Sequence, residues 1–221
     1  RLLEAVGVPP ARRRPWPSPF ADGLAAIAGR AGRPTAVVAS GDPMHFGVGA
    51  TLARRHGAGE MTVRTAPSAF SLAAARLKWP LEEVACLSLH DRPVETLHPH
   101  LAPGARLLAL TRDGDGPAAI AAFLQGLGLG ASLLHVMEEM AGPRERARTF
   151  RADEAIPQVH ALNVVGIACR ADAGAAPDPA AGRRTPGLPD EAFRHDGQIT
   201  KADVRATTLA ALAPRPGEVL W

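Results

Sequence analysis

The chain has 221 residues, of which 46% are hydrophobic and 21% are charged, and its formal net charge is +3. This length and composition suit a globular protein with one large domain or two smaller lobes. No apolar run reaches about 18 residues, so no membrane-spanning helix is expected, and the basic residues are not interleaved with aromatic ones as nucleic-acid binding would require.

The first half of the chain alternates between helical and extended patterns. Leu24 and Ile27 are spaced by three in an alanine-rich stretch, which predicts a helix over 21–31. The pattern next predicts a buried strand over 35–40, a helix over 48–56, a strand over 60–67 and a helix over 69–78.

The same alternation continues to residue 169. Apolar runs predict strands over 84–90, 105–111, 132–138 and 160–169, with a helix over 117–127. Strands that alternate with helices are typical of an α/β fold with largely parallel pairing. The loop at 98–104 is the expected hinge between two lobes, which span about 1–100 and 104–170.

The composition changes after residue 170. Residues 171–187 are rich in Ala, Gly and Pro without apolar periodicity, which predicts an interdomain linker. Thr200 and Asp203 have the spacing of a capping box at the start of a further helix, and 213–221 reads as a turn entering a strand. Because that strand ends at once, and because 1–20 holds no opening strand, we expect the chain to be an internal piece of a longer polypeptide.

The most distinctive short motif is Gly41-Asp42-Pro43, which follows the expected strand over 35–40. In open α/β sheets, ligands bind beyond the carboxyl ends of strands, and Asp42 has the chemistry to accept hydrogen bonds from a ligand. The alternative is a turn in which the aspartate bonds its own backbone. No metal site is expected, because no Cys or carboxylate cluster accompanies His98 and His100.

Other polar groups carry two interpretations each. His90-Asp91-Arg92 stands at the end of a predicted strand, where it forms either a surface turn or a site for an anion or for proton transfer. Glu138-Glu139 is interpreted as a solvated loop or as the start of a helix. Nearly all basic side chains are Arg, which reflects genomic base composition or suits a polycarboxylate ligand. Cys86 and Cys169 lie in apolar stretches and are expected to be reduced core residues of a cytoplasmic protein.

Several segments together resemble the tetrapyrrole methylases, in the order found in that family. The segments are ASGDPMHFGVGATLARR, APSAFSLAAARLKWP, LSLHDRP, VMEEMAGPRERAR and LNVVGIAC. The stretch from Gly187 to the last residue resembles the opening of a second, Rossmann-type methyltransferase domain. The resemblance therefore implies a tetrapyrrole methylase domain over 1–170 without its first strand, a linker, and the start of the second domain over 188–221.

The resemblance implies a two-lobe α/β fold of the class III methyltransferases, which bind S-adenosylmethionine in the cleft between the lobes. By motif position, it assigns the cofactor to residues from several loops: Gly41, Asp42, His45, Phe70, Ser71, Thr111, Ala161, Leu162 and Asn163. His90 is the candidate for a catalytic base. Arg92 and Arg112 are the candidates for holding substrate carboxylates.

The implied reaction is methylation of a precorrin ring in cobalamin biosynthesis. The part of the family that this chain resembles methylates ring carbon C5. The second half would methylate C15 and remove the C12 acetate carboxylate. Two alternatives stay open: a tetrapyrrole methylase that acts at a different carbon, and a non-catalytic α/β fragment that docks onto a partner. Members of the family are often dimers, so a homo-oligomer is compatible with the resemblance.

Overall fold

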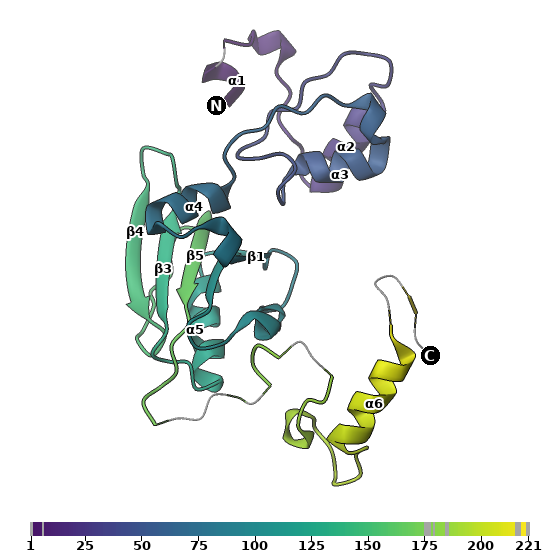
Figure 1. Ribbon diagram of the computed structural model, residues 1–221. Helices are drawn as coiled ribbons and strands as arrows, with labels where there is room; N and C mark the ends of the chain where they lie inside the picture. Colours follow the sequence, from purple (N-terminus) through teal and green to yellow (C-terminus); the bar gives the residue numbers. More distant parts are fainter. Residues whose placement is uncertain are drawn as a thin grey trace. The chain divides into compact units, whose positions relative to one another are not determined.

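The computed structural model describes residues 2–5, 7–174, 178, 180–183, 186–214 and 218–219. The chain divides into two compact units, Arg1–Ala69 and Phe70–Trp221, and each is described by itself (Figure 1). No helix among these described residues is long and apolar enough to cross a membrane.

The first unit is helical in its described residues. It contains α1 (Leu2–Ala5), α2 (Phe20–Ala28) and α3 (Val48–His56), with short 3-10 turns at Pro10–Arg12 and Ala58–Glu60. The helices predicted over 21–31 and 48–56 are confirmed. Helix α3 ends with three basic residues, Arg54, Arg55 and His56, which the negative end of the helix dipole favours.

The strands predicted over 35–40 and 60–67 are wrong, since no described residue of the first unit lies in a strand. Val37 and Val38 are 37% and 46% exposed instead of buried. A strand needs a neighbour to satisfy its backbone N–H and C=O groups, and neither segment finds one among the described residues. Residue preference alone does not make a strand, because β propensity depends on packing.

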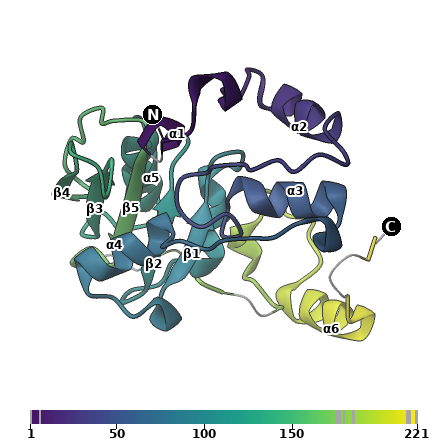
Figure 2. The same ribbon diagram turned by 90° about the horizontal axis from the view of Figure 1, so that it is seen from above.

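The second unit is built on a five-stranded sheet with the order β1-β2-β5-β3-β4. The strands are β1 (Ala85–Ser88), β2 (Arg106–Leu110), β3 (Leu133–Glu138), β4 (Arg146–Arg151) and β5 (Asn163–Ala168). In both views β3, β4 and β5 lie side by side (Figure 2). The strands predicted over 84–90, 105–111, 132–138 and 160–169 are confirmed.

The expectation of largely parallel pairing is wrong for this sheet. Among the described residues only β1 and β2 run parallel, while β2–β5, β3–β5 and β3–β4 are antiparallel. Strands β3 and β4 are joined by a short turn, and a parallel connection needs a crossover of a dozen or more residues. Strand β4 was not predicted, because its sequence RARTFR lacks an apolar face and lies at the sheet edge.

Helices cover both faces of the sheet (Figure 1). On one face, α5 (Gly116–Gly126) buries Ile120 and Leu124 among Leu107, Val136 and Ile167. On the other face lies α4 (Ala69–Leu77), which comes so close that a Cβ at Gly166 would stand 2.5 Å from the end of the Leu77 side chain. The absence of a side chain at Gly166 therefore permits this close packing. The helices predicted over 69–78 and 117–127 are confirmed.

A bidentate ion pair ties α4 to the turn between β3 and β4. Arg76 donates to both carboxylate oxygens of Glu145 at 2.6 and 2.8 Å, and the Ala141 N–H donates to the same carboxylate at 2.7 Å. The guanidinium and this N–H lower the pKa of Glu145 to about 2. The pair fixes the end of the hairpin against the helix.

The segment 98–104 is not the place where the structure divides. Leu97, within the 3-10 helix Val94–His100, and Leu101 are fully buried in the core of the second unit. The division falls between Ala69 and Phe70, so β1 belongs to the same sheet as the later strands. A buried leucine pair holds this segment in place where a hinge was expected.

The described part of 171–187 packs against the rest of the second unit. The Asp172 carboxylate accepts the Ala131 N–H at 2.5 Å, the Gly182 N–H donates to the His98 carbonyl at 3.0 Å, and Ala180 is buried. Residues 175–177, 179 and 184–185 of the expected linker lie outside the described residues. The linker assignment stays a prediction.

Beyond this segment come a 3-10 turn at Asp190–Ala192 and helix α6 (Ala202–Leu212). The expected capping box is not formed, because Lys201 is the N-cap residue and no side chain caps the helix. Arg205 instead holds the segment together through Asp190 at 2.7 Å and the Leu188 carbonyl at 2.5 Å. Residues 213, 214, 218 and 219 are not in a strand, and the rest of 213–221 lies outside the described residues.

Candidate functional site

The Gly-Asp-Pro loop of the first unit is a tight turn closed by its own aspartate. Gly41 has a φ of +68°, a conformation that favours glycine, and the Asp42 carboxylate accepts the Met44 N–H at 2.7 Å. This is the backbone-bonded turn that the sequence left open as an alternative. The second carboxylate oxygen of Asp42 is not used in this bond and keeps its capacity to accept a ligand's hydrogen bonds.

Two later glycines let the loop fold back onto the start of α3. A Cβ at Gly47 would stand 2.5 Å from the Asp42 carbonyl oxygen, and one at Gly49 would stand 2.7 Å from Pro43. The Ala50 N–H donates to the Pro43 carbonyl at 3.0 Å. The sequence GDPMHFGVG therefore builds one compact loop, in which the glycines are required by close contact.

His45 contacts Ser68, which lies near the end of the first unit. Its ring Nδ1 lies 3.3 Å from the hydroxyl of Ser68, a residue that is 4% exposed. Within this unit the structure thus joins Gly41, Asp42 and His45 into one loop next to Ser68. The remaining expected cofactor residues belong to the second unit.

Thr111 and Asn163 form a buried polar cluster at the ends of β2 and β5. The Thr111 hydroxyl donates to the Asn163 side-chain oxygen at 2.8 Å, and the Asn163 amide donates to the backbone oxygens of Asp113 at 3.1 Å and His160 at 3.0 Å. Both side chains are less than 10% exposed. Asn163 therefore links the turn after β2 to the turn before β5.

The turn before β5 presents Ala161 and Leu162 to solvent. The Leu162 side chain is 66% exposed although it is apolar, and Ala161 is exposed as well. The Leu162 carbonyl accepts the Glu139 N–H at 3.0 Å, and the Leu162 N–H donates to the ring of His160 at 3.1 Å. These hydrogen bonds fix the backbone of the turn. Its exposed apolar surface is therefore suited to pack against the flat face of a purine.

Phe70 and Ser71 lie in the first turn of α4. Phe70 is 1% exposed, so its side chain is fully buried. Only its backbone is left to meet a cofactor. Ser71 is half-buried on the same turn.

His90 follows β1 and contacts the Thr111 backbone. Its Nδ1 lies 3.1 Å from the Thr111 carbonyl oxygen. Because a carbonyl only accepts, Nδ1 must carry the proton, and a neutral ring then keeps the Nε2 lone pair. The His90 side chain is exposed, which leaves Nε2 accessible to a substrate proton.

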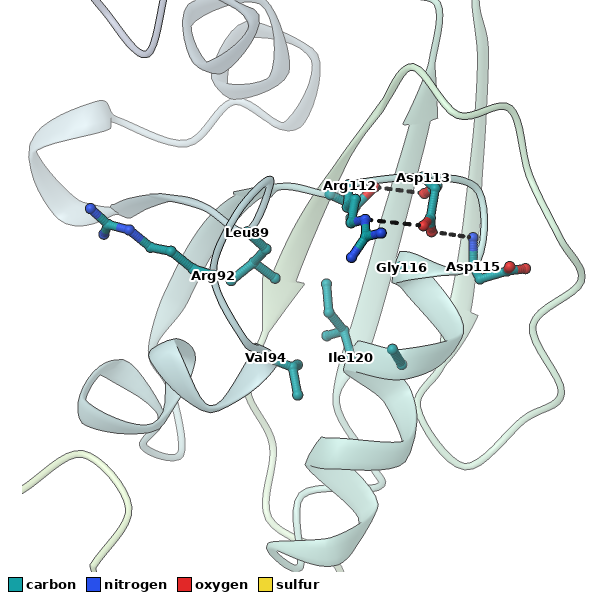
Figure 3. Close-up of a pocket in the computed structure, with 10 residues that line it drawn as sticks. Leu89, Arg92, Val94, Arg112, Asp113, Asp115, Gly116 and Ile120 are labelled. Atoms are coloured by element: carbon teal, nitrogen blue, oxygen red, sulfur yellow. Dashed lines mark hydrogen bonds and ion pairs between the residues drawn. The ribbon is translucent and has the colours of Figure 1, made fainter. Parts of the chain in front are cut away.

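A cavity of about 290 Å³ opens beyond the carboxyl ends of the parallel pair β1 and β2. Leu89, Val94 and Ile120 converge on its apolar side, Arg112 points toward it, and Arg92 extends away from it (Figure 3). The lining residues are Leu89, Arg92, Val94, Thr111, Arg112, Asp113, Asp115, Gly116, Ala119 and Ile120. The structure thus gathers Arg92, Thr111 and Arg112 around one cavity.

Hydrogen bonds already occupy the carboxylates at this cavity. Asp113 accepts the Asp115 N–H at 3.0 Å and lies 4.0 Å from the Arg112 guanidinium, and Asp115 accepts from Gln158 at 3.0 Å. The Arg112 side chain is 79% exposed. The cavity therefore combines the exposed guanidinium of Arg112 with an apolar lining. This combination is suited to an apolar ring that carries carboxylates.

Sequence reasoning missed Glu138, which was interpreted as part of a solvated loop or a helix start. It is the last residue of β3 and is 6% exposed. Burial by itself raises the pKa of Glu138, but the His160 N–H and the Arg148 guanidinium outweigh it and hold the pKa below its usual value. The available signal was its place at the end of the strand predicted over 132–138, on the same face of the strand as Leu134 and Val136. No group of His, Cys, Asp and Glu in the described part of the chain is arranged to hold a metal ion.

Comparison with known proteins assigns the chain to a family. The model of the tetrapyrrole (corrin/porphyrin) methylases matches residues 21–156, and the model of a precorrin methyltransferase domain matches residues 191–221. The first match covers more than half of the chain. The chain belongs to the tetrapyrrole (corrin/porphyrin) methylase family. The stretch between the two matches contains the expected linker.

The chain is 49% identical over 207 residues to a protein of a Sinorhizobium species named precorrin-6Y C(5,15)-methyltransferase (decarboxylating), covering 93% of this chain and 49% of that protein. It is 42% identical over 219 residues to a Mycobacterium tuberculosis protein of the same name, covering 96% and 52%. The chain spans about half the length of these curated relatives.

A solved structure has the same fold. The cobalamin biosynthesis precorrin-6Y methylase of Archaeoglobus fulgidus superposes with a TM-score of 0.55 at 27% identity, covering 75% of this chain and 79% of that one. The mixed sheet with helices on both faces is therefore the sheet of a tetrapyrrole methylase.

Proposed function

We propose that the chain is the part of a precorrin C5,15-methyltransferase that transfers a methyl group from S-adenosylmethionine to ring carbon C5. The observation that carries this proposal is the 49% identity, over 93% of the chain, to a protein named precorrin-6Y C(5,15)-methyltransferase (decarboxylating). The match of residues 191–221 to a precorrin methyltransferase domain supports it, since a second methyltransferase half is what C15 methylation and decarboxylation require.

The cofactor chemistry fits the residues present. S-adenosylmethionine supplies an activated methyl group on a sulfonium, so the protein's part is to orient the donor and to keep water out. Asp42 offers carboxylate oxygen to an ammonium or hydroxyl group from a loop held by Gly47 and Gly49. The turn 160–162, fixed by Asn163, offers backbone groups of Ala161 and the apolar Leu162 side chain to the adenine.

His90 is the residue placed to take a proton from the substrate. Its Nδ1–H is engaged by the Thr111 carbonyl at 3.1 Å, which fixes the ring orientation and directs the Nε2 lone pair outward. When a ring carbon gains a methyl group, the tetrapyrrole can lose a proton to restore conjugation. An oriented imidazole with a free Nε2 is suited to accept that proton.

Arg92 and Arg112 serve the substrate carboxylates in this proposal. Precorrins carry acetate and propionate groups, and guanidinium groups pair with carboxylates through charge-assisted hydrogen bonds. Arg112 points toward the cavity beyond β1 and β2, Arg92 lies at its edge with an exposed side chain directed outward, and Leu89, Val94 and Ile120 give apolar support. We place the edge of the tetrapyrrole at this cavity.

The direct test is a calorimetric titration of the chain with S-adenosylhomocysteine, and of the variant Asp42→Ala. We expect one-to-one saturable binding by the chain and an affinity at least about tenfold lower for the variant, because a charge-assisted hydrogen bond is lost. The variant Asp22→Ala, at an exposed residue on α2, is the control and should bind as the chain does. Absence of binding by the folded chain would contradict the cofactor assignment.

The substrate assignment makes a separate prediction. Replacing both Arg92 and Arg112 with Gln is expected to weaken precorrin binding by about tenfold or more, since two charge-assisted contacts disappear. Affinity for S-adenosylhomocysteine should stay the same. Absorption titration with the precorrin measures the first and calorimetry the second. Arg194→Gln, an exposed residue far along the chain, is the matched control, and an equal loss in the control would argue for charge attraction in general.

A further inference from the structure

Glu138 occupies an unusual position for a carboxylate. It is the last residue of β3, directly opposite Asn163 in the β3–β5 register, and it is 6% exposed. Buried acidic residues are rare unless they are paired. The hydrogen-bond partners of Glu138 therefore indicate why an acidic residue occupies this position.

Both oxygens of Glu138 have a donor. Oε1 accepts from Arg148 Nη2 on β4 at 2.8 Å, and Oε2 accepts the backbone N–H of His160 at 2.8 Å. The Arg148 guanidinium lies over the Phe150 ring at 5.4 Å, and its Nε is buried without a hydrogen bond among the described residues. Glu138 thus anchors the arginine on one side and the turn before β5 on the other.

The next residue holds the same turn at a second point. Glu139, with a φ of +46°, donates its backbone N–H to the Leu162 carbonyl at 3.0 Å. Its own carboxylate pairs with Arg144 at 2.6 Å. Two consecutive residues at the end of β3 therefore fasten both ends of the turn 160–162, one through a side chain and one through the backbone.

The ionised form of the Glu138 carboxyl is the form that makes both contacts. A carboxylate accepts from a guanidinium and from a backbone N–H at once, whereas a neutral amide has only one accepting oxygen. The surroundings lower the pKa of Glu138 against the effect of burial. The carboxyl is consequently charged at neutral pH, and the turn is held by a charge-assisted hydrogen bond.

We propose that Glu138 is a positioning residue for the cofactor, which acts through the His160 N–H to hold the turn 160–162 in the form that receives the adenine. This proposal rests on the proposed function, because the adenine is assigned to Ala161, Leu162 and Asn163 there. Glu138 itself does not touch the cofactor. By holding the exposed turn in one conformation before the cofactor binds, Glu138 reduces the conformational entropy that the turn loses on binding.

The test compares Glu138→Gln with the matched variant Glu139→Gln. The Glu139 change keeps the N–H that bonds Leu162 and alters a carboxylate that pairs with Arg144 at 2.6 Å and lies 3.8 Å from the His160 ring. The comparison therefore separates the bond to the His160 N–H from a contact with the His160 ring. We expect Glu138→Gln to raise the Kd for S-adenosylhomocysteine by about tenfold or more, because the strongest contact to the turn is lost. We expect the affinity of the Glu139→Gln variant to change less than about threefold, since Arg144, the partner it loses, is 68% exposed.

A second readout separates positioning from loss of structure. Hydrogen exchange at the His160 amide should become faster in Glu138→Gln, while exchange in β2 and the affinity for the precorrin stay the same. Equal Kd values for S-adenosylhomocysteine in the chain and in Glu138→Gln would overturn the proposal. If the unmodified chain did not bind the ligand, the proposed function would fail on its own evidence, and unchanged His160 exchange would then overturn the positioning role independently.

Arg148→Gln covers the case in which Glu138→Gln does not fold. This change keeps both groups of the Glu138–His160 bond, but it removes the guanidinium that orients the carboxylate and should therefore weaken that bond. A smaller loss of ligand affinity, of several-fold, together with faster His160 exchange, supports the proposal. Unchanged values for both measurements would overturn it.

Discussion

Replacing Asn163 with Leu is expected to destabilise the second unit by about 2–4 kcal/mol, because buried carbonyl groups lose their donors. The Asn163 amide is the donor to the Asp113 and His160 carbonyls at 3.1 and 3.0 Å, and its oxygen accepts from Thr111 at 2.8 Å. Leucine fills a similar volume but supplies none of these groups. Urea unfolding measures the effect as a change in midpoint at constant slope.

The control for this variant is the neighbouring residue. Leu162 is 66% exposed, so Leu162→Ala should change the free energy of unfolding by less than about 0.5 kcal/mol. Asn163→Leu should also lose affinity for S-adenosylhomocysteine if the turn before β5 holds the adenine. A loss of stability no larger than that of Leu162→Ala would show that the buried cluster is not what joins the two turns.

Gly47→Ala is expected to disrupt the Gly-Asp-Pro loop and to lower the affinity for S-adenosylhomocysteine by more than about tenfold. The added Cβ would stand 2.5 Å from the Asp42 carbonyl oxygen and 2.6 Å from that of Pro43. Both neighbours are backbone atoms, so the loop itself must move, at a cost of about 1–3 kcal/mol for overpacking. The φ of −106° at Gly47 is accessible to alanine, which leaves the contact as the cause.

Gly59→Ala is the matched control in the same unit. A Cβ at Gly59 meets nothing within 4 Å, and this variant should bind the ligand as the unmodified chain does. Calorimetry of both variants, with thermal unfolding alongside, makes the comparison. Normal binding by Gly47→Ala would mean that the loop shape does not control the cofactor, and Asp42 would then lose its assigned role.

Most of the second unit could be predicted from local sequence. Strands β1, β2, β3 and β5 are apolar runs, and α4 and α5 show helical spacing, so each element is encoded where it occurs. Strand β4 could not be found, because an edge strand with arginines at Arg146, Arg148 and Arg151 has no periodic apolar face. The pairing direction was also hidden, since it depends on which strand inserts between β2 and β3.

In the first unit the same reasoning gave strands that the structure lacks. The β-branched residues of 35–40 and 60–67 favour extended backbone, yet a strand exists only when a neighbour completes its hydrogen bonds. Helix α3 was predictable because its hydrogen bonds are internal to the segment. Local sequence is thus a sufficient guide for helices here and an insufficient one for strands.

The candidate site divides in the same way. The sequence by itself determined the motif GDP with its glycines, the ends of the sheet strands that carry His90, Thr111 and Asn163, and the resemblance to the tetrapyrrole methylases. These features depend on residues that are adjacent in the chain, or on the order of segments, and both are visible in the sequence itself.

Only the tertiary structure decided which polar groups meet. Thr111 and Asn163 are 52 residues apart in the chain and join in a 2.8 Å hydrogen bond. Glu138 looked like a surface acid and is buried between Arg148 and His160. Such contacts depend on strand order and register, and a register set by non-local pairing is invisible to a reading of neighbouring residues. The sequence therefore determined the chemistry available to this protein, and the sheet determined where that chemistry is brought together.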